Sequence, residues 1–306
     1  MMGRQVALLR REMWEHRSIF VVPAVVAVLM VLSSLTGQVS VNHIEHIDAG
    51  IIGIQNLPEN ARSAALTIMM IGMTTPFIIA MWVLTIFYAL DSLYSERKDR
   101  SILFWRSIPV TDLETVVSKL VTAVIIIPLV TFALVVVTQV LVLATTSAWI
   151  NIRGGSPWHM IWTAMPFADS WIATLTLLLA LPLWLSPFIG WFLFVSAFTK
   201  RSPLLVAAMP IVLLPMLEKL FFGTGLLADA FFVRSIKMPL FAGIDNMELF
   251  FREGEDLTRF ADARLSLTGL LDVGGFLQDP RLWTGFIVCG LFTAAAIYVR
   301  RYRDES

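Results

Sequence analysis

The sequence predicts an all-α membrane protein with six transmembrane helices. Hydrophobic residues make up 57% of the 306 residues, charged residues make up only 15%, and the mean hydropathy is +0.77. Long runs of the chain contain no charged residue, and about 20 apolar residues of helix cross a bilayer core about 30 Å thick. Backbone amides must be paired inside hydrocarbon, so these runs are expected to be helices.

Six apolar runs are long enough to be spans, within one transmembrane domain that covers residues 1–306. The predicted spans are 19–36, 66–90, 120–146, 171–197, 203–222 and 282–299. We expect the first span to be retained, because about 18 residues is too long for a typical signal peptide core and no convincing A-x-A site follows. Pro182, Pro187 and Gly190 lie close together and indicate a bend in the fourth span.

Residues 1–18 are predicted to form a basic helix in the membrane interface. Val6, Leu9 and Met13 fall on one helix face at about 100° per residue, and the arginines fall outside that face. Such a helix can lie in the interface before the chain enters the bilayer. The alternative is an ordinary basic flank of the first span.

The distribution of basic residues predicts the orientation of the chain. Lys and Arg gather in the segments that the six-span layout places on one side, namely 1–17, 91–119, 198–202 and 300–303. The loops 37–62 and 147–170 hold only Arg62 and Arg153. The excess of basic residues in cytoplasmic loops therefore puts both termini in the cytoplasm and residues 223–280 outside.

Residues 91–119 form the most distinctive loop. The stretch "DSLYSERKDR" is predicted to continue the second span as a helix, and "SILFWRSI" then offers an apolar, aromatic segment before Pro109. Thr111 or Asp112 can cap a new helix that runs through Lys119 into the third span. The sequence thus predicts a short helix presented at the inner surface, although the aromatic residues would also suit the headgroup region.

The outer segment 223–280 is predicted to contain one or two amphipathic helices. The stretch "ELFFREGEDLTRFADARLSLTGLL" mixes apolar and charged residues at near-helical spacing. We expect these helices to lie on or dip into the outer leaflet. Gly274 and Gly275 are expected to break the chain before the last span.

The chain carries no motif for its own chemistry. It has no G-x-x-x-x-G-K-[ST], no G-x-S-x-G and no H-E-x-x-H, so no catalytic, cofactor or metal site is predicted. The stretch "NHIEHID" offers metal-ligand types but no partner set, and it reads better as a solvated loop. The single cysteine, Cys289, is interpreted as a packing residue.

The polar groups within the spans restrict the class of transporter. Glu218 and Lys219 interrupt the fifth span near its outer end, where they are either functional or snorkel to the interface. No carboxylate is expected at the midplane, which counts against a proton- or ion-coupled transporter. Proline within spans two and five, at Pro76, Pro210 and Pro215, is compatible with helices that move.

The loop "SERKDRSILFWRSIPVTDLETVVSKL" resembles the signature loop of ABC-2 type permeases, the membrane subunits of bacterial ATP-binding-cassette exporters. The matching residues are the Glu96–Arg97 pair, the tract from Ile108 to Thr111, and Lys119. The six spans, the basic N-terminal helix and the long outer segment also fit that family in layout. One departure is that "ILFWRSIPVT" is more aromatic than the commoner, glycine-containing version.

The resemblance implies that the loop is a coupling helix, which docks into a cleft of a separate cytoplasmic ATPase subunit. Phe104, Trp105 and Ile108 would dock, and Glu96, Arg97 and Arg106 would fix the orientation through charge pairs. Spans two and five would form the moving wall, with gating or pathway residues at Pro76, Pro210, Pro215, Glu218 and Lys219.

The resemblance also implies partners and a compartment. ATP and Mg²⁺ would be bound by the ATPase subunits and not by this chain, which would form a homodimer in the bacterial plasma membrane. The substrate would be amphipathic or apolar, such as a lipid, a peptide or a drug-like molecule, and no nucleic acid is expected as a partner. Two alternatives are a non-transport assembly or sensor subunit that recruits an ATPase, and an intramembrane enzyme.

Overall fold

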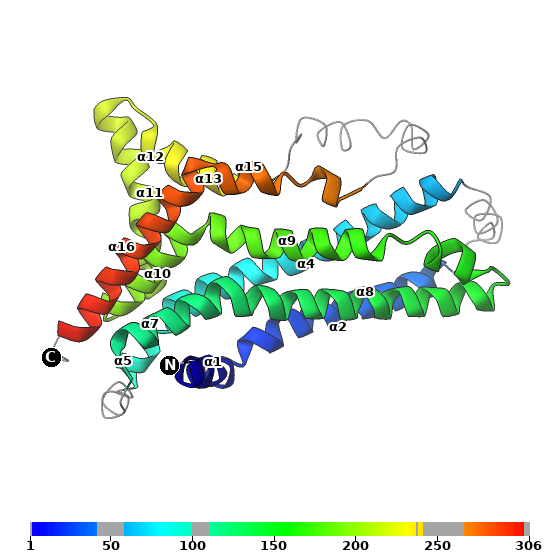
Figure 1. The fold of residues 1–306 in the computed structure, drawn as a ribbon, viewed down its shortest axis with the longest axis horizontal. Coiled ribbons are helices and arrows are strands. Elements are labelled where there is room, and N and C mark those ends of the chain that lie inside the picture. The colour runs from blue at the N-terminus through cyan, green and yellow to red at the C-terminus, as the bar shows by residue number, and fades with distance from the viewer. Residues whose placement is uncertain (1, 42–57, 100–109, 237, 241–265, 303–306) are drawn as a thin grey trace.

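A computed structural model describes residues 2–41, 58–99, 110–236, 238–240 and 266–302. Within these residues the chain forms helices and no β-strand (Figure 1). Three predicted features lie outside the described residues. They are the loop "NHIEHID", the segment 100–109 with Phe104, Trp105, Arg106 and Ile108, and most of the predicted amphipathic helices within 248–271.

The described residues contain six helices that are long and apolar enough to cross a membrane. They are α2 (Ser18–Val41), α4 (Glu59–Asp91), the continuous run of α7 (Asp112–Val121), η1 (Thr122–Ile126) and α8 (Ile127–Ile152), α9 (Phe167–Trp184), α11 (Pro203–Phe222) and α16 (Pro280–Tyr302). The predicted class, an all-α protein with six helices of transmembrane length and composition, is confirmed.

Two of these helices are longer than a bilayer requires. The α4 helix has 33 residues and the run from α7 to α8 has 41, which at 1.5 Å per residue gives lengths of about 50 and 60 Å. The predicted spans were shorter because they were bounded by charged residues, and a helix continues past such residues where it meets water. In Figure 1, α2, α4, α8 and α9 extend to the right, well beyond α10, α11 and α16.

The fourth span is divided into two helices, as its prolines indicated. The α9 helix ends at Trp184 and α10 (Ser186–Phe198) begins two residues later, after Leu185. In Figure 1, α9 follows the long axis of the bundle, whereas α10 follows the tilted α16. The carbonyl oxygen of Trp184, at this break, accepts hydrogen bonds from the Arg234 guanidinium at 2.9 and 3.1 Å.

The core lies where α2, α4, η1, α8, α9 and α10 meet. Fully buried side chains from these helices include Ile19, Met81, Ile127, Leu178 and Ile189. Where the helices pack in water, burial of such side chains is the main favourable contribution to stability. Where they pack within lipid, dispersion contacts between the side chains stabilise the bundle.

The buried side-chain amide of Gln139 links α8 to α4 and α9. Gln139 Nε2 on α8 donates to the Met70 carbonyl and the Thr74 hydroxyl of α4 at 3.3 and 3.2 Å. Gln139 Oε1 accepts from Trp171 Nε1 of α9 at 3.1 Å. Both polar atoms of the Gln139 side chain, the amide nitrogen and the amide oxygen, therefore have hydrogen-bond partners on neighbouring helices.

The described part of the outer segment is made of short helices. They are α12 (Leu226–Ala228), η3 (Asp229–Val233), α13 (Arg234–Ile236), η4 (Thr268–Leu270) and α15 (Val273–Gln278). The predicted break at Gly274 and Gly275 is wrong, because both residues lie inside α15. The Asp272 carboxylate caps this helix by accepting from Gly275 N at 2.7 Å, which stabilises the turn despite the glycines.

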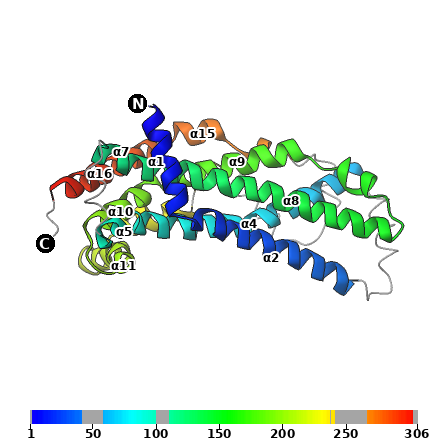
Figure 2. The same ribbon diagram turned by 90° about the horizontal axis from the view of Figure 1, so that it is seen from below.

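Two further helices lie at the end of the bundle that holds both termini, which we name the basal end. The first, α1 (Met2–Glu15), confirms the helix predicted for residues 1–18. It is seen nearly end-on in Figure 1 and runs across the long axis of the bundle in Figure 2. The second, α5 (Tyr94–Lys98), follows α4 as the sequence predicted.

The α10 and α16 helices approach closely at Gly190. A Cβ atom on Gly190 would lie 2.9 Å from the Cα and 3.0 Å from the carbonyl oxygen of Cys289, whereas one on Gly290 would meet nothing within 4 Å. We predict that Gly190→Ala forces the two backbones apart and costs about 1–3 kcal/mol. Gly290→Ala is predicted to be neutral or slightly stabilising, because alanine is the better helix former.

The test is the fraction of detergent-solubilised protein that remains monodisperse after heating, measured by size-exclusion chromatography for both variants. Equal midpoints for Gly190→Ala and Gly290→Ala would contradict the close approach of these helices.

Candidate functional site

A cluster of buried charges lies at the basal end, where four elements meet. It combines Glu12 of α1, Glu96 of α5, Lys119 of α7 and Arg300 of α16, which are 1%, 5%, 0% and 5% exposed. We name these four residues the basal charge cluster. Charged side chains are rarely buried to this degree unless they are paired.

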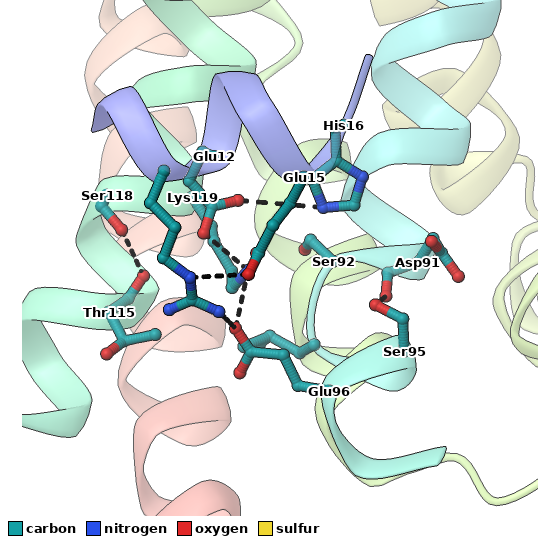
Figure 3. A network of polar contacts seen from close by, with 12 residues as sticks. Glu12, Glu15, His16, Asp91, Ser92, Ser95, Glu96, Thr115, Ser118 and Lys119 are labelled. Carbon is teal, nitrogen blue, oxygen red and sulfur yellow. Dashed lines mark hydrogen bonds and ion pairs between the residues drawn. The ribbon is translucent and has the colours of Figure 1, made fainter. Parts of the chain in front are cut away.

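The four side chains form one connected set of ion pairs. Lys119 Nζ lies 2.8 Å from Glu12 Oε1 and 3.1 Å from Glu96 Oε1, and Figure 3 shows these side chains converging below α1. Arg300 Nη1 lies 2.6 Å from the other carboxylate oxygen of Glu96, Oε2. The Glu96 carboxylate therefore bridges α7 and α16, with two carboxylates facing two cations.

Further charged residues surround the cluster at its edge. Arg11 donates to Glu96 Oε1 at 3.0 Å and to Glu15 Oε1 at 2.8 Å, and Arg300 Nε donates to Asp112 Oδ1 at 2.9 Å. Removing a charge from water costs several kcal/mol, and that cost is offset only where the ionic partners are close and well hydrogen-bonded. The edge residues supply such partners to Glu96 and Arg300.

Tyr88 and His16 border the basal charge cluster next to Glu12. The Tyr88 hydroxyl donates to Glu12 Oε2 at 2.8 Å, and the His16 ring packs edge-on against the Tyr88 ring at 4.8 Å. Burial lowers the pKa of His16 below its ordinary value of 6.5, and the nearby Lys119 ammonium lowers it further. His16 is therefore neutral at pH 7, and its 3.9 Å approach to Glu12 is not an ion pair at that pH.

Local sequence explains how α7 is placed. The Thr111 hydroxyl accepts from Glu114 N at 3.1 Å, and the Glu114 carboxylate accepts from Thr111 N at 2.9 Å. This reciprocal capping box starts the helix at Asp112, as the sequence predicted. Seven residues after Asp112, two turns into the helix, Lys119 faces the cluster.

The α5 helix is fixed by a second set of contacts. The Arg97 guanidinium donates to the carbonyl oxygens of Ser196 and Thr199 at 2.6 and 2.7 Å, at the C-terminal end of α10. The Ser196 hydroxyl accepts from the backbone amides of Leu93 and Tyr94 at 3.0 and 2.9 Å. A cation at a helix C-terminus also interacts favourably with the helix dipole.

These contacts hold both ends of the segment between α5 and α7. Glu96 precedes the segment and Lys119 follows it, and the two residues are joined directly. Glu96 and Arg97 were predicted to orient a partner through charge pairs, and the contacts described for them lie within the chain. Phe104, Trp105, Arg106 and Ile108 belong to the part of the loop outside the described residues.

Three carboxylates in this region lie close enough to hold a cation. Oxygen atoms of Glu12, Glu15 and Glu96 are within 4.8 Å of one another. The Lys119 ammonium and the Arg11 guanidinium already neutralise these oxygens at distances of 2.8 to 3.1 Å. A metal ion would have to displace both cations, so the donor set fits internal ion pairing better than metal binding.

The predicted gating residues lie in α4 and α11. Both helices continue through their prolines, Pro76 in α4 and Pro210 and Pro215 in α11. The Glu218 carboxylate accepts from Thr224 Oγ1 at 2.6 Å and from Leu226 N and Leu227 N at 2.9 and 2.7 Å, which fixes the turn after α11. Lys219 is exposed, and its carbonyl oxygen accepts from Gly223 N at the end of the helix.

Sequence reasoning missed most of the basal charge cluster. Glu12 was read as part of a basic helix, and Arg300 was counted only as a basic residue of the tail. One signal was available in the sequence, because Glu12, Glu96, Lys119 and Arg300 each lie within two turns of the same predicted end of an apolar run. Residues of opposite charge at one predicted depth are candidates for pairing.

No family model, curated protein or solved structure matches this chain. A proposal of function therefore depends on two observations. One is the geometry at the basal end, and the other is the sequence of the loop 91–119, in which Glu96 and Lys119 belong to the basal charge cluster.

Removal of one buried charge tests the basal charge cluster. We predict that Lys119→Met lowers the free energy of unfolding by about 3–5 kcal/mol, because it leaves Glu12 without its cation. The double variant Glu12→Gln/Lys119→Met is predicted to lose less than the sum of its single variants. The measurement is the temperature at which Cys289, the only cysteine and a buried one, reacts with a thiol-specific dye.

The matched control is Arg301→Gln, since this residue is exposed at the same end and is expected to change stability by less than about 0.5 kcal/mol. Equal effects of Lys119→Met and Arg301→Gln would show that the buried pairs contribute nothing.

The lowered pKa of His16 predicts a pH dependence. A histidine whose folded pKa lies below its unfolded value binds fewer protons when folded, so stability falls as the pH drops below about 6.5. The melting temperature of the protein is therefore expected to fall between pH 7.5 and pH 5.5, and to fall less for His16→Gln. An unchanged pH profile in this variant would rule out His16 as the source.

Proposed function

We propose that this chain is the transmembrane subunit of an ATP-binding-cassette exporter of the ABC-2 type. In this proposal residues 91–119 form the coupling loop, and a separate cytoplasmic subunit binds ATP and Mg²⁺. The chain itself is not an enzyme and binds no cofactor. Support comes from the six apolar helices, from the loop sequence, and from the anchoring of that loop.

The observation that carries the proposal is the bridge made by Glu96. This residue belongs to the loop, and its two carboxylate oxygens contact Lys119 on one side and Arg300 on the other. If an ATPase pushes on the loop, the contacts at the two ends of the loop must stay intact for the force to reach the transmembrane helices. Ion pairs buried to 5% exposure or less are difficult to separate without breaking the fold.

The same contacts suggest how force from an ATPase reaches the helices. Phe104, Trp105 and Ile108 would dock, and Arg106 would orient the loop. A push on the loop would then act on α4 and α5, on α7 with α8, on α16 through Arg300, and on α1 through Arg11. The helices closest to the loop would tilt together, while α11, which packs little against the rest, could move separately.

The proposed orientation follows from the charges and the placement of the termini. Both described termini and the ends of the loop lie at the basal end (Figure 1), and basic residues concentrate there. We therefore assign the basal end to the cytoplasm and the membrane to the bacterial plasma membrane. The least buried spans, α2 and α11, offer apolar surface to lipid and to a second copy of the chain in a homodimer.

The chemistry of the spans favours an amphipathic or apolar substrate, such as a lipid, a peptide or a drug-like molecule. Polar side chains of the spans are mainly Thr, Ser and Gln139, many of them hydrogen-bonded within the bundle. In this proposal Pro76, Pro210, Pro215, Glu218 and Lys219 serve gating or line the pathway.

The double variant Phe104→Ala/Trp105→Ala tests the docking step. We predict that the tagged wild-type chain, purified in mild detergent from cells that express its neighbouring genes, recovers an ATP-binding subunit, and that the double variant loses at least about tenfold of it. The lost contact is apolar and aromatic, and such anchors dominate interfaces. Mass spectrometry of the co-purified chains is the measurement.

The control for docking is Ile152→Ala/Trp158→Ala, which removes two exposed apolar side chains at the opposite end. Recovery of the chain with no ATPase, in wild type as well as in the variants, would contradict the proposal. Stimulation of the ATPase by candidate substrates would then separate a transporter from an assembly or sensor subunit.

A further inference from the structure

Arg234 of the outer segment places a cation between the divided fourth span and α16. Its guanidinium donates from Nε and Nη2 to the Trp184 carbonyl oxygen and lies 4.7 Å from the centroid of the Trp184 ring. The Trp184 indole nitrogen donates back to the Arg234 carbonyl oxygen at 2.8 Å. A Cβ atom on Gly285 of α16 would overlap Arg234 Nη2, so the guanidinium occupies space that only a glycine leaves open. The position of this charge is therefore fixed by its neighbours.

The surroundings of Arg234 are mainly apolar. Trp184, which carries the contacts with Arg234, belongs to a cluster of buried hydrophobic residues at the junction of the fourth span, the outer segment and α16. The cluster consists of Ala180, Trp184, Leu185, Met238, Leu240, Phe276 and Leu282. A cation beside such a cluster loses part of its hydration, and this loss is costly unless hydrogen bonds and an opposite charge compensate for it.

The charge of Arg234 has no close carboxylate among the described residues, whose ion pairs do not include Arg234. Burial lowers the pKa of Arg234, the more distant Asp279 carboxylate raises it, and the positive charge of Arg281 lowers it. Asp279 Oδ1 already accepts from Arg281 N at 2.7 Å, at the start of α16. Two cations, Arg234 and the exposed Arg281, thus share one carboxylate that is engaged elsewhere.

The Arg234 guanidinium keeps hydrogen-bonding capacity for a ligand. A guanidinium carries five N–H donors in one plane, and the contacts with Trp184 engage only Nε and Nη2. Nη1 makes no hydrogen bond within the described residues, and it is not buried. Arginine N–H groups in such a plane match the geometry of phosphate oxygens.

The depth of Gly285 in α16 indicates where a ligand comes from. Gly285 follows Pro280, the first residue of this candidate span, by five residues, or about 8 Å along the helix axis. In a membrane this depth corresponds to the boundary between headgroups and hydrocarbon. Leu277, Trp283 and Ile287, at the same end of α16, are 51%, 56% and 65% exposed and offer apolar surface to acyl chains.

We propose that Arg234 and Arg281 form a site for the phosphate of an anionic phospholipid. The phosphate accepts hydrogen bonds from Arg234 Nη1, the charge of Arg281 strengthens the attraction, and the acyl chains lie along the exposed apolar side chains of α16. A bound anion offsets the partly buried charge that no described carboxylate offsets. A zwitterionic lipid binds less well, because its own ammonium group already neutralises its phosphate. This site requires no ATPase and does not depend on the exporter function.

The experiment locates the bound lipid on the full chain in a neutral detergent. Phosphatidylglycerol with a photoreactive group in its acyl chain is crosslinked to the protein, and the labelled peptides are identified by mass spectrometry. The start of α16 should be labelled, and unlabelled phosphatidylglycerol should compete more strongly than phosphatidylcholine or inorganic phosphate. Arg234→Gln should lower the affinity at this position at least about tenfold, because a hydrogen bond to a charged group is lost. Arg234→Lys keeps the charge without the planar fork and should lose less.

Two glycine variants of α16 test the position of the guanidinium without removing its charge. Gly285→Ala displaces the guanidinium and should also weaken labelling, whereas a Cβ on Gly290 meets nothing within 4 Å and Gly290→Ala should leave labelling intact. Arg301→Gln removes an exposed charge at the basal end and should have no effect at the start of α16. Melting without lipid, followed through the reactivity of Cys289, shows which variants are folded. If Arg234→Gln does not fold, Arg234→Lys and Gly285→Ala decide the outcome.

Two results would overturn the proposal. One is equal labelling of wild type and of the folded variants at Arg234 and Gly285, which would show that the guanidinium does not hold the lipid. The other is competition by inorganic phosphate as strong as that by phosphatidylglycerol, which would assign the site to a free anion in place of a lipid headgroup.

Discussion

The Glu96 carboxylate, held between Lys119 and Arg300, is the interaction on which the basal end depends. Its oxygens lie 3.1 Å from the lysine ammonium and 2.6 Å from the arginine guanidinium, and all three side chains are buried. None of these charges could remain in place if its partner were removed, because an unpaired buried charge is strongly destabilising. The end of α16, the α7 helix and the short α5 are therefore fixed as a unit, and α1 joins them through Glu12.

This arrangement divides the bundle into two parts with different constraints. Of the helices that meet at the basal charge cluster, α7 continues through η1 into α8, and these contribute Ala123 and Ile127 to the apolar core. By contrast, α11 buries only Ala207 and Pro215, and a glycine with φ of 68° ends it at Gly223. A displacement of the loop would thus be shared by the helices that meet at the basal charge cluster, whereas few buried side chains restrain α11 within the described chain.

The sequence predicted the helices well because their causes are local. Charge-free runs mark spans, proline marks the divided fourth span, and the Thr111–Glu114 pair marks the start of α7. The exact ends of α4 and α8 were missed, since polar residues such as Glu59 and Asn151 are compatible with helix outside lipid. The sequence predicted a break at Gly274 and Gly275 because glycine has poor helix propensity. The prediction failed because the cap supplied by Asp272 outweighs that propensity.

The site was less predictable, because its residues come together only after the helices pack. Glu96 and Lys119 were singled out from the loop motif. Their partners lie far away in the chain, since Arg300 is 204 residues from Glu96 and Glu12 is 107 residues from Lys119. Sequence spacing on one helix cannot indicate such pairs. Asp169 is similar, since its carboxylate accepts from the backbone amides of Leu267 and Thr268 in the outer segment.

The most direct test of the account is whether motion reaches α16 through Glu96. Spin labels at Val137 on α8 and Val288 on α16, both exposed, would be placed in a chain that carries Cys289→Ala, and their separation measured in complex with the ATPase. The account predicts that ATP binding changes this distance, and that Glu96→Gln abolishes the change while the ATPase stays bound. The same change of distance in Glu96→Gln would contradict it.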